Sequence, residues 1–161
     1  MQRVLVATCG NSSAGDDSFG PRVGRLLRAS PYAGVGVVDL DIKPAALFDH
    51  LPGPDCLVLV DAVRMPGGGG GQLVQIDLRE GELPALLNDD AMSSHGLGLA
   101  HQLALARQLD LLPEQVWLVG AVIDRVDRAS EPSGWMDEVV ELAHRQVLSI
   151  AQGSASRSTQ V

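Results

Sequence analysis

Apolar positions along the chain form short unbroken runs that alternate with longer amphipathic segments. The runs are rich in β-branched side chains, which is typical of strands buried on both faces of a mainly parallel sheet, and they cover residues 3–8, 34–40, 56–61, 72–77 and 115–122. The amphipathic segments predict helices over residues 18–29, 45–50, 96–109 and 133–151, with a short helix near 83–87. This alternation predicts a three-layer α/β domain with helices on both sides of a five-stranded, mainly parallel sheet.

Two segments fall outside this alternation. Residues 67–71 are five consecutive glycines, and they predict a mobile loop because a glycine backbone is costly to hold in one conformation. Residues 153–161 are rich in serine and predict a frayed end. We therefore expect one domain over residues 1–152, followed by a flexible C-terminal tail.

The charge balance narrows the range of partners. The chain carries 12 basic and 20 acidic residues, for a net charge of -8, and Lys43 is its single lysine. Nucleic acids and anionic membranes are therefore poor partners, whereas a metal ion or a protein with a basic segment is favoured. The apolar runs are too short for a signal peptide or a membrane span, so we expect a cytoplasmic protein. We also expect the protein to be a monomer.

The two cysteines, Cys9 and Cys56, lie at the ends of predicted strands without a C-x-x-C spacing. This placement predicts buried free thiols rather than a disulfide framework. Cys9 lies near acidic residues, so a nucleophilic role is the alternative.

Candidate chemistry begins with Asp16 and Asp17, which follow the first strand. In nucleotide-binding α/β domains a glycine-rich turn at this place receives phosphate, but two carboxylates repel an anion and suit a cation. The alternative is that they only complement the dipole of the next helix. Pro21 fits only the first helical turn, so we expect the helix to begin at Ser18 or later, with both acids outside it.

A third carboxylate and a histidine extend this candidate site. Asp61 ends the third strand, and in a flavodoxin-like strand order the first and third strands are neighbours, which places Asp61 beside the acidic pair. His95 stands at the start of a long helix. Each could be an ordinary structural residue, but two carboxylates and one imidazole from three loops together suit Ni²⁺ or Zn²⁺. The other histidines lack matching acids and are expected at the surface or in packing; they are His50, His101 and His144.

With these residues in place, the chain resembles the hydrogenase maturation endopeptidases, which process the large subunit of nickel–iron hydrogenases. The resemblance runs from about residue 3 to residue 150. It rests on Cys9-Gly10-Asn11, Gly15-Asp16-Asp17-Ser18-Phe19-Gly20, Arg22-Val23, Val60-Asp61-Ala62, Pro66-Gly67, Ser94-His95 and Trp117-Leu118-Val119-Gly120.

The resemblance implies a phosphorylase/hydrolase-like α/β/α sandwich that removes a C-terminal peptide from the hydrogenase large-subunit precursor after nickel insertion. In that family the nickel belongs to the precursor, and the residues that recognise it match Asp17, Asp61 and His95. Other divalent ions such as Zn²⁺ can occupy such a site. A metal held there could polarise the scissile carbonyl or activate a water, with Asp16 as the candidate base. Whether the ion is a catalyst or a recognition handle stays open.

The chain also departs from the family pattern. Thr8 stands where the family usually has glycine, and residues 121–124 lack its usual Gly-x-x-Pro ending.

Two other functions stay open. A doubly wound small-molecule or nucleotide-binding module is supported by Asp39 and Asp41 after the second strand, but opposed by the absence of G-x-G-x-x-G. A metallohydrolase with its own bound ion, acting on small amides, is the other.

Overall fold

The computed structural model describes residues 3–65, 67–79, 94–124 and 131–158, without the side chains of residues 94–97 and 155–158. Its described strands form one twisted sheet in the order β2-β1-β3-β5-β4. β4 runs antiparallel to β5, and the other neighbours are parallel. The strands are β1 (Val4–Cys9), β2 (Val35–Asp41), β3 (Cys56–Val63), β4 (Leu73–Asp77) and β5 (Gln115–Val122).

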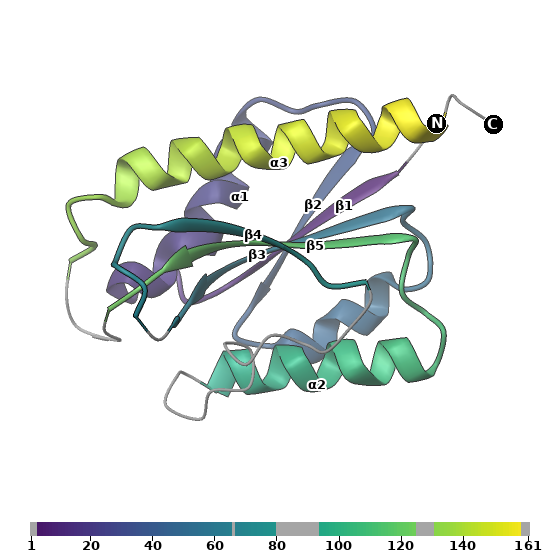
Figure 1. Cartoon of the computed structure of the whole chain (residues 1–161), viewed down its shortest axis with the longest axis horizontal. Coiled ribbons are helices and arrows are strands. Elements are labelled where there is room, and N and C mark those ends of the chain that lie inside the picture. Colours follow the sequence, from purple (N-terminus) through teal and green to yellow (C-terminus); the bar gives the residue numbers. More distant parts are fainter. Residues whose placement is uncertain (1–2, 66, 80–93, 125–130, 159–161) are drawn as a thin grey trace.

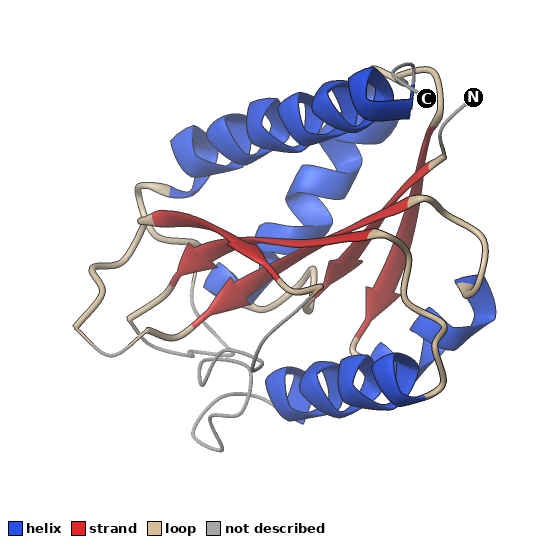
Figure 2. Ribbon diagram, turned by 45° about the vertical axis from the view of Figure 1, so that its right-hand side comes forward, coloured by secondary structure: helices blue, strands red, loops and turns tan. Residues whose placement is uncertain are grey.

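Helices cover both faces of this sheet, as the alternation of patterns predicted (Figures 1 and 2). α1 (Phe19–Ala29) and α3 (Met136–Ser158) lie on one face, and α2 (Ser94–Gln108) with the 3₁₀ helix η2 (Pro44–His50) lies on the other. A second 3₁₀ helix, η1 (Gly15–Ser18), precedes α1. Because two apolar clusters fill the two interfaces and every residue of β3 is buried, the predicted three-layer α/β/α sandwich is confirmed.

The end of α3 differs from the sequence prediction. The helix continues to Ser158, so the predicted boundary after residue 152 falls inside it and the expected tail does not begin at residue 153. Ser154 is 1% exposed, and its Oγ donates to Gln115 Oε1 at 2.8 Å. The hydroxyl of Ser154, which the sequence placed in a tail, therefore has a part-buried hydrogen-bond partner in the sheet. The helix predicted near residues 83–87 lies outside the described residues.

The glycine run also has more structure than a featureless loop. Gly67 and Gly71 take φ values of +75° and +88°, which only glycine adopts readily. The Gly68 N–H donates to Met65 O, and the Gly71 N–H donates to Val122 O, each at 2.9 Å. The run therefore forms hydrogen-bonded turns joined to the end of β5, where the sequence predicted a mobile loop.

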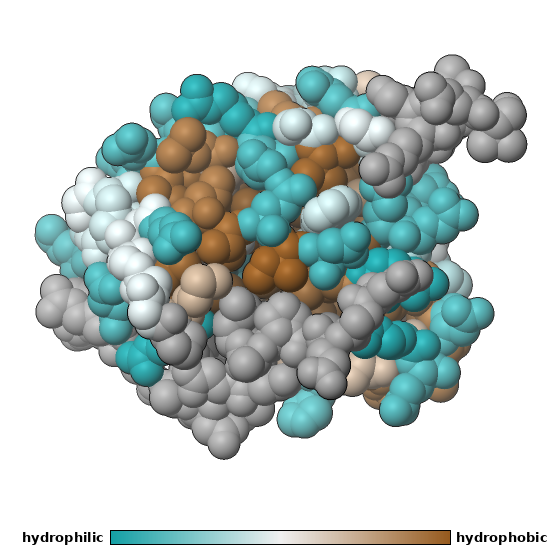
Figure 3. Space-filling model, viewed as in Figure 1, coloured by the Kyte–Doolittle hydropathy of each residue, from teal (hydrophilic) through white to brown (hydrophobic). Residues whose placement is uncertain are grey.

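Figure 3 shows apolar surface between polar residues on the face that carries α3 and the β4 edge of the sheet. Partly buried apolar side chains pack against the core of the α3 layer, among them Leu73, Trp117 and Trp135. No helix within the described ranges is long and apolar enough to cross a membrane.

Candidate active site

The carboxyl ends of β1 and β3 form the floor of the candidate site. Thr8 pairs with Val60 in the parallel register, so Cys9 and Asp61 follow at the same edge of the sheet. The first turn of α1 lies directly on both strand ends at Gly20, where an added Cβ would lie 2.2 Å from the Cys9 carbonyl oxygen. The predicted adjacency of the first and third strands is thus confirmed. The close approach of α1 also brings η1, which carries Asp16 and Asp17 and is called the acidic turn below, to the same edge of the sheet.

Asp17 is held back over the end of β1 by the backbone. Gly10 has φ +129°, and a Cβ there would lie 2.2 Å from the Asp17 carbonyl oxygen, so the chain passes itself too closely for a side chain. The Asn11 N–H donates to Asp17 Oδ2 at 3.0 Å. Asp17 is 8% exposed, in a 3₁₀ turn outside α1, as the position of Pro21 predicted.

Asp61 is buried beside this carboxylate. It is 3% exposed, and burial raises its pKa to about 8, with a further rise from the charge of Asp17 and an opposing effect of the hydrogen bond from the Ala62 backbone. Two carboxyl groups in one buried corner cannot both ionise without cost, so Asp61 keeps its proton at neutral pH. A divalent cation would displace that proton and relieve the repulsion.

Cys9 lies in the same corner. Burial raises the pKa of its thiol well above the ordinary value, and the charges of Asp61 and Asp17 raise it further. Both cysteines are free and buried, which confirms the prediction of unpaired thiols. The thiolate form that a nucleophile needs is therefore disfavoured at Cys9.

Asp16 faces away from the other two acids. Its Oδ1 accepts the backbone N–H of Ser133 at 2.7 Å, and its Oδ2 accepts the Ser133 hydroxyl at 2.6 Å. Ser133 lies 117 residues away in the sequence, so no local pattern could have identified it. Both carboxylate oxygens already hold a donor, which is the geometry of an anchor.

His95 lies at the start of the described part of α2, as predicted, but its side chain is outside the described residues. The start of α2 lies at the carboxyl edge of the sheet, since a Cβ on Gly98 would lie 3.0 Å from Pro44 Cγ and Pro44 follows the end of β2. Among the described side chains, no three His, Cys, Asp or Glu residues are arranged to hold a metal ion. The structure therefore brings Asp17 and Asp61 together and leaves the third member of the predicted set unplaced.

One of the two acids that supported a nucleotide-binding module, Asp39, has another role. Thr8 Oγ1 donates to Asp39 Oδ1 at 2.6 Å, and Arg28 pairs with Asp39 Oδ2 at 3.0 Å. Thr8, which stands where the resembled family usually has glycine, is fully buried. Asp39 thus ties β1, β2 and α1 together instead of facing a ribose.

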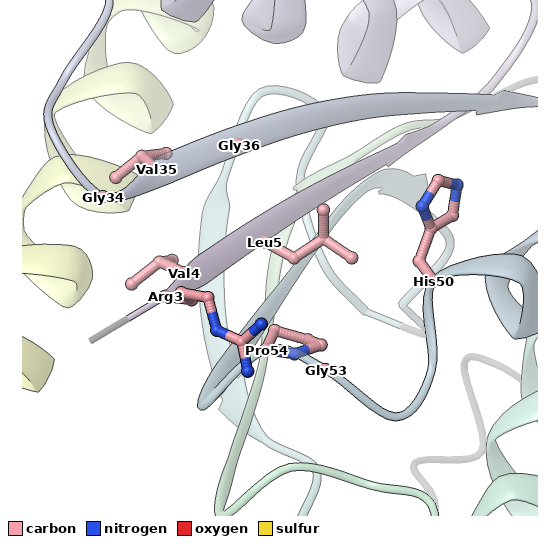
Figure 4. A pocket seen from close by; sticks show the side chains of 9 residues that line it. All are labelled: Arg3, Val4, Leu5, Gly34, Val35, Gly36, His50, Gly53 and Pro54. Carbon is pink, nitrogen blue, oxygen red and sulfur yellow. The ribbon is translucent and has the colours of Figure 1, made fainter. Parts of the chain in front are cut away.

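A hollow in the surface lies away from this site. It measures 450 Å³ and lies where β1 and β2 begin, at the opposite end of these strands from Asp17 (Figure 4). Its lining residues include Arg3, Leu5 and the exposed His50, and they do not include Asp16, Asp17 or Asp61. His101 is exposed and His144 is half-buried on α3, as the sequence predicted for histidines outside the site.

Comparison with known proteins identifies the family. A model of the hydrogenase maturation protease family matches residues 21–151. The chain belongs to this family. The hydrogenase maturation proteases are peptidases, and the resemblance inferred from the motifs is thereby confirmed.

The related proteins agree in sequence and in fold. The chain is 33% identical over 119 residues to the hydrogenase expression/formation protein HupM of Azotobacter chroococcum mcd 1, and 32% identical over 119 residues to HoxM of Azotobacter vinelandii. Each match covers 73% of this chain and 56% of the relative, so the chain spans about half the length of these curated relatives. The hydrogenase maturating endopeptidase HybD from E. coli superimposes with a TM-score of 0.82 at 26% identity, covering 95% of this chain and 94% of that one.

Proposed function

We propose that this member of the hydrogenase maturation protease family is a cytoplasmic endopeptidase that removes the C-terminal peptide from the precursor of a nickel–iron hydrogenase large subunit, after nickel has been inserted. The observation that carries the proposal is the buried pair of Asp17 and Asp61 at the carboxyl edge of the sheet. Such a pair costs folding energy unless a cation or a substrate group uses it.

Nickel enters this proposal as cargo of the substrate. Oxygen ligands from Asp17 and Asp61 with a nitrogen ligand from His95 fit a borderline ion, and the proton held by Asp61 is the one that the arriving ion would replace. In this proposal the repulsion between the carboxyl groups of Asp17 and Asp61 is relieved only by a precursor that carries nickel. Cleavage would thereby be coupled to nickel insertion. Zn²⁺ is the natural probe for the same donor set.

The residues of this chain would then hold the precursor's metal-bearing segment against the sheet edge. Asp16 is a candidate base in this scheme, provided that one of its oxygens leaves Ser133 during turnover. The net charge of -8 favours a precursor segment that carries basic residues.

A processing assay tests the function directly. Purified chain is incubated with nickel-loaded and nickel-free large-subunit precursor, and removal of the peptide is followed by the mobility shift of the subunit on a gel. We expect shortening of the loaded precursor alone. A precursor that stays full-length in both incubations, with the chain shown to be folded, would refute the proposal, and equal cleavage of both would refute its dependence on nickel.

A thermal-shift series separates the alternatives. A metallohydrolase with its own ion would be strongly stabilised by Zn²⁺ alone, whereas a site completed by the precursor's metal would show only modest stabilisation by free ion. Stabilisation by ATP or NAD would favour the nucleotide-binding module instead.

A further inference from the structure

Ser133 contacts Asp16 of the acidic turn from a segment near the far end of the described chain. It reaches Asp16 through both its backbone N–H and its hydroxyl, at 2.7 and 2.6 Å. Hydrogen bonds to an ionised acceptor are shorter and stronger than those between neutral groups. The contact is therefore a firm bidentate link between two distant segments.

The link ends on a rigid element. The Ser133 carbonyl accepts the Met136 N–H at 3.0 Å, so Ser133 is continuous with the first turn of α3. α3 is fixed in turn by its buried stripe against the sheet, which includes Met136 and Val139. The Asp16 carboxylate also lies near the start of this helix, where negative charge is favoured by the helix dipole.

The turn geometry passes this constraint to Asp17. Asp16 and Asp17 are consecutive in η1, and successive side chains of a 3₁₀ helix point about 120° apart because it has three residues per turn. With Asp16 directed at α3, Asp17 is directed at the strand ends, where its carboxylate accepts the Asn11 N–H. A rotation of the turn that freed Asp16 would also withdraw Asp17.

The turn needs such an anchor because its own charges oppose its position. Asp17 is 8% exposed, so its carboxylate loses most of its hydration when the turn packs against the strand ends. On the other side of η1, Arg22 Nε donates to Ser18 Oγ at 2.8 Å and holds the turn to α1. Ser133 supplies the corresponding restraint from α3.

We infer that Ser133 is a positioning residue of the candidate active site: by holding Asp16 against the start of α3, it keeps Asp17 directed toward Asp61. This inference rests on the proposed function for its effect on processing, but not for its effect on the acidic turn. Asp16, in this arrangement, acts by anchoring the turn.

The test uses the full chain with Ser133→Ala, Ser133→Thr and a control, Ser149→Ala, which removes an exposed serine of α3. Amide hydrogen exchange is measured for Asn11, whose N–H donates to Asp17, and for Val58 and Leu59 in buried β3. We expect Ser133→Ala to speed exchange at Asn11 by about tenfold with β3 unchanged, because one hydrogen bond of the anchor is lost locally. Ser133→Thr keeps both donors and should restore protection.

Processing kinetics give the second readout. Ser133→Ala should lower kcat by about tenfold while KM stays within about twofold, as for an outer residue that orients a ligand. The double variant Asp16→Ala/Ser133→Ala should be no slower than Asp16→Ala, because both changes break the same link. Ser149→Ala should match the unaltered chain.

The outcomes separate the two proposals. Unchanged exchange at Asn11 in a folded Ser133→Ala chain would overturn the positioning role, whatever the enzyme does. Faster exchange at Asn11 in a chain that processes no precursor would support the positioning role and refute the proposed function. Uniformly faster exchange in β3 as well would show a purely structural serine, and would also overturn the inference.

Discussion

At the scale of single residues, the candidate site places two carboxyl groups where burial disfavours their ionised forms. Asp17 and Asp61 are nearly inaccessible to solvent, at 8% and 3% exposed. Burial alone already favours the protonated form of Asp61, and the neighbouring carboxylate adds to this preference. A cation that bound to both carboxylates would have to displace this proton.

The proposed recognition set is tested by single substitutions. Asp17→Ala, Asp61→Ala and His95→Ala should each slow removal of the C-terminal peptide by roughly a hundredfold or more, because each removes one ligand of the precursor's metal. His101→Ala is the matched control, since His101 is an exposed histidine of the same helix. Gel mobility of the large subunit measures the rates. Normal processing by the Asp17 or His95 variant would refute the site assignment.

The buried acid also predicts how stability depends on pH. The pKa of Asp61 is about 8 in the folded chain and about 3.9 when unfolded, so between these values the folded state binds more protons. The stabilisation is complete below about pH 4 and is lost as pH rises through about 8. Urea unfolding at pH 5, 7 and 9 should therefore show falling stability.

Asp61→Asn removes this titration. Its stability should vary less with pH and exceed that of the unaltered chain at pH 9, because no buried charge forms. Asp137→Asn, at an exposed aspartate of α3, should leave the pH dependence unchanged. If the unaltered chain and Asp61→Asn lose stability in parallel from pH 5 to 9, Asp61 is not the buried acid that the structure describes.

At the scale of elements, glycines decide how closely segments approach. Gly20 lets α1 rest on the ends of β1 and β3, and Gly10 lets the chain pass Asp17. The glycines of residues 67–71 differ from one another in how much space an added Cβ would have. A Cβ on Gly71 would lie 2.8 Å from the Trp135 ring, whereas a Cβ on Gly69 would meet nothing within 4 Å.

This inequality gives a matched pair of variants. Gly71→Ala should destabilise the chain by about 1–3 kcal/mol, because φ +88° is strained for alanine and the methyl group would strike Trp135. Gly69→Ala should be within about 0.5 kcal/mol of the unaltered chain. Urea unfolding measures both. Equal stability of the two variants would favour a loop without fixed conformation, as the sequence suggested.

At the scale of the whole molecule, α3 connects the two ends of the parallel strands. Its first turn adjoins Ser133 and the acidic turn, and its later part reaches Gln115, where β5 begins, through Ser154. A single helix therefore joins the candidate site to the opposite end of the sheet. The part of α3 that follows Ala151 supplies Ser154, which makes the contact with Gln115.

Truncation tests this part of the helix. Ending the chain after residue 152 should lower the free energy of unfolding by about 1–2 kcal/mol, because Gln115 loses its buried partner and the helix loses its last turns. Ending it after residue 158 is the control and should have little effect. Thermal unfolding of the two truncated chains measures the difference. Equal midpoints would show that residues 153–158 contribute nothing to stability.

The sequence by itself determined the layers, the strands and the acidic pair, because burial on both faces leaves continuous β-branched runs and a proline fixes where α1 can begin. It also indicated that Asp61 lies beside Asp17, since parallel strands end at one edge. Only the tertiary structure decided that Asp16 bonds to Ser133, that Cys9 lies beside both buried acids and that Ser154 bonds to Gln115. These are contacts between segments distant in sequence, and local periodicity carries no information about which distant partner satisfies a polar group.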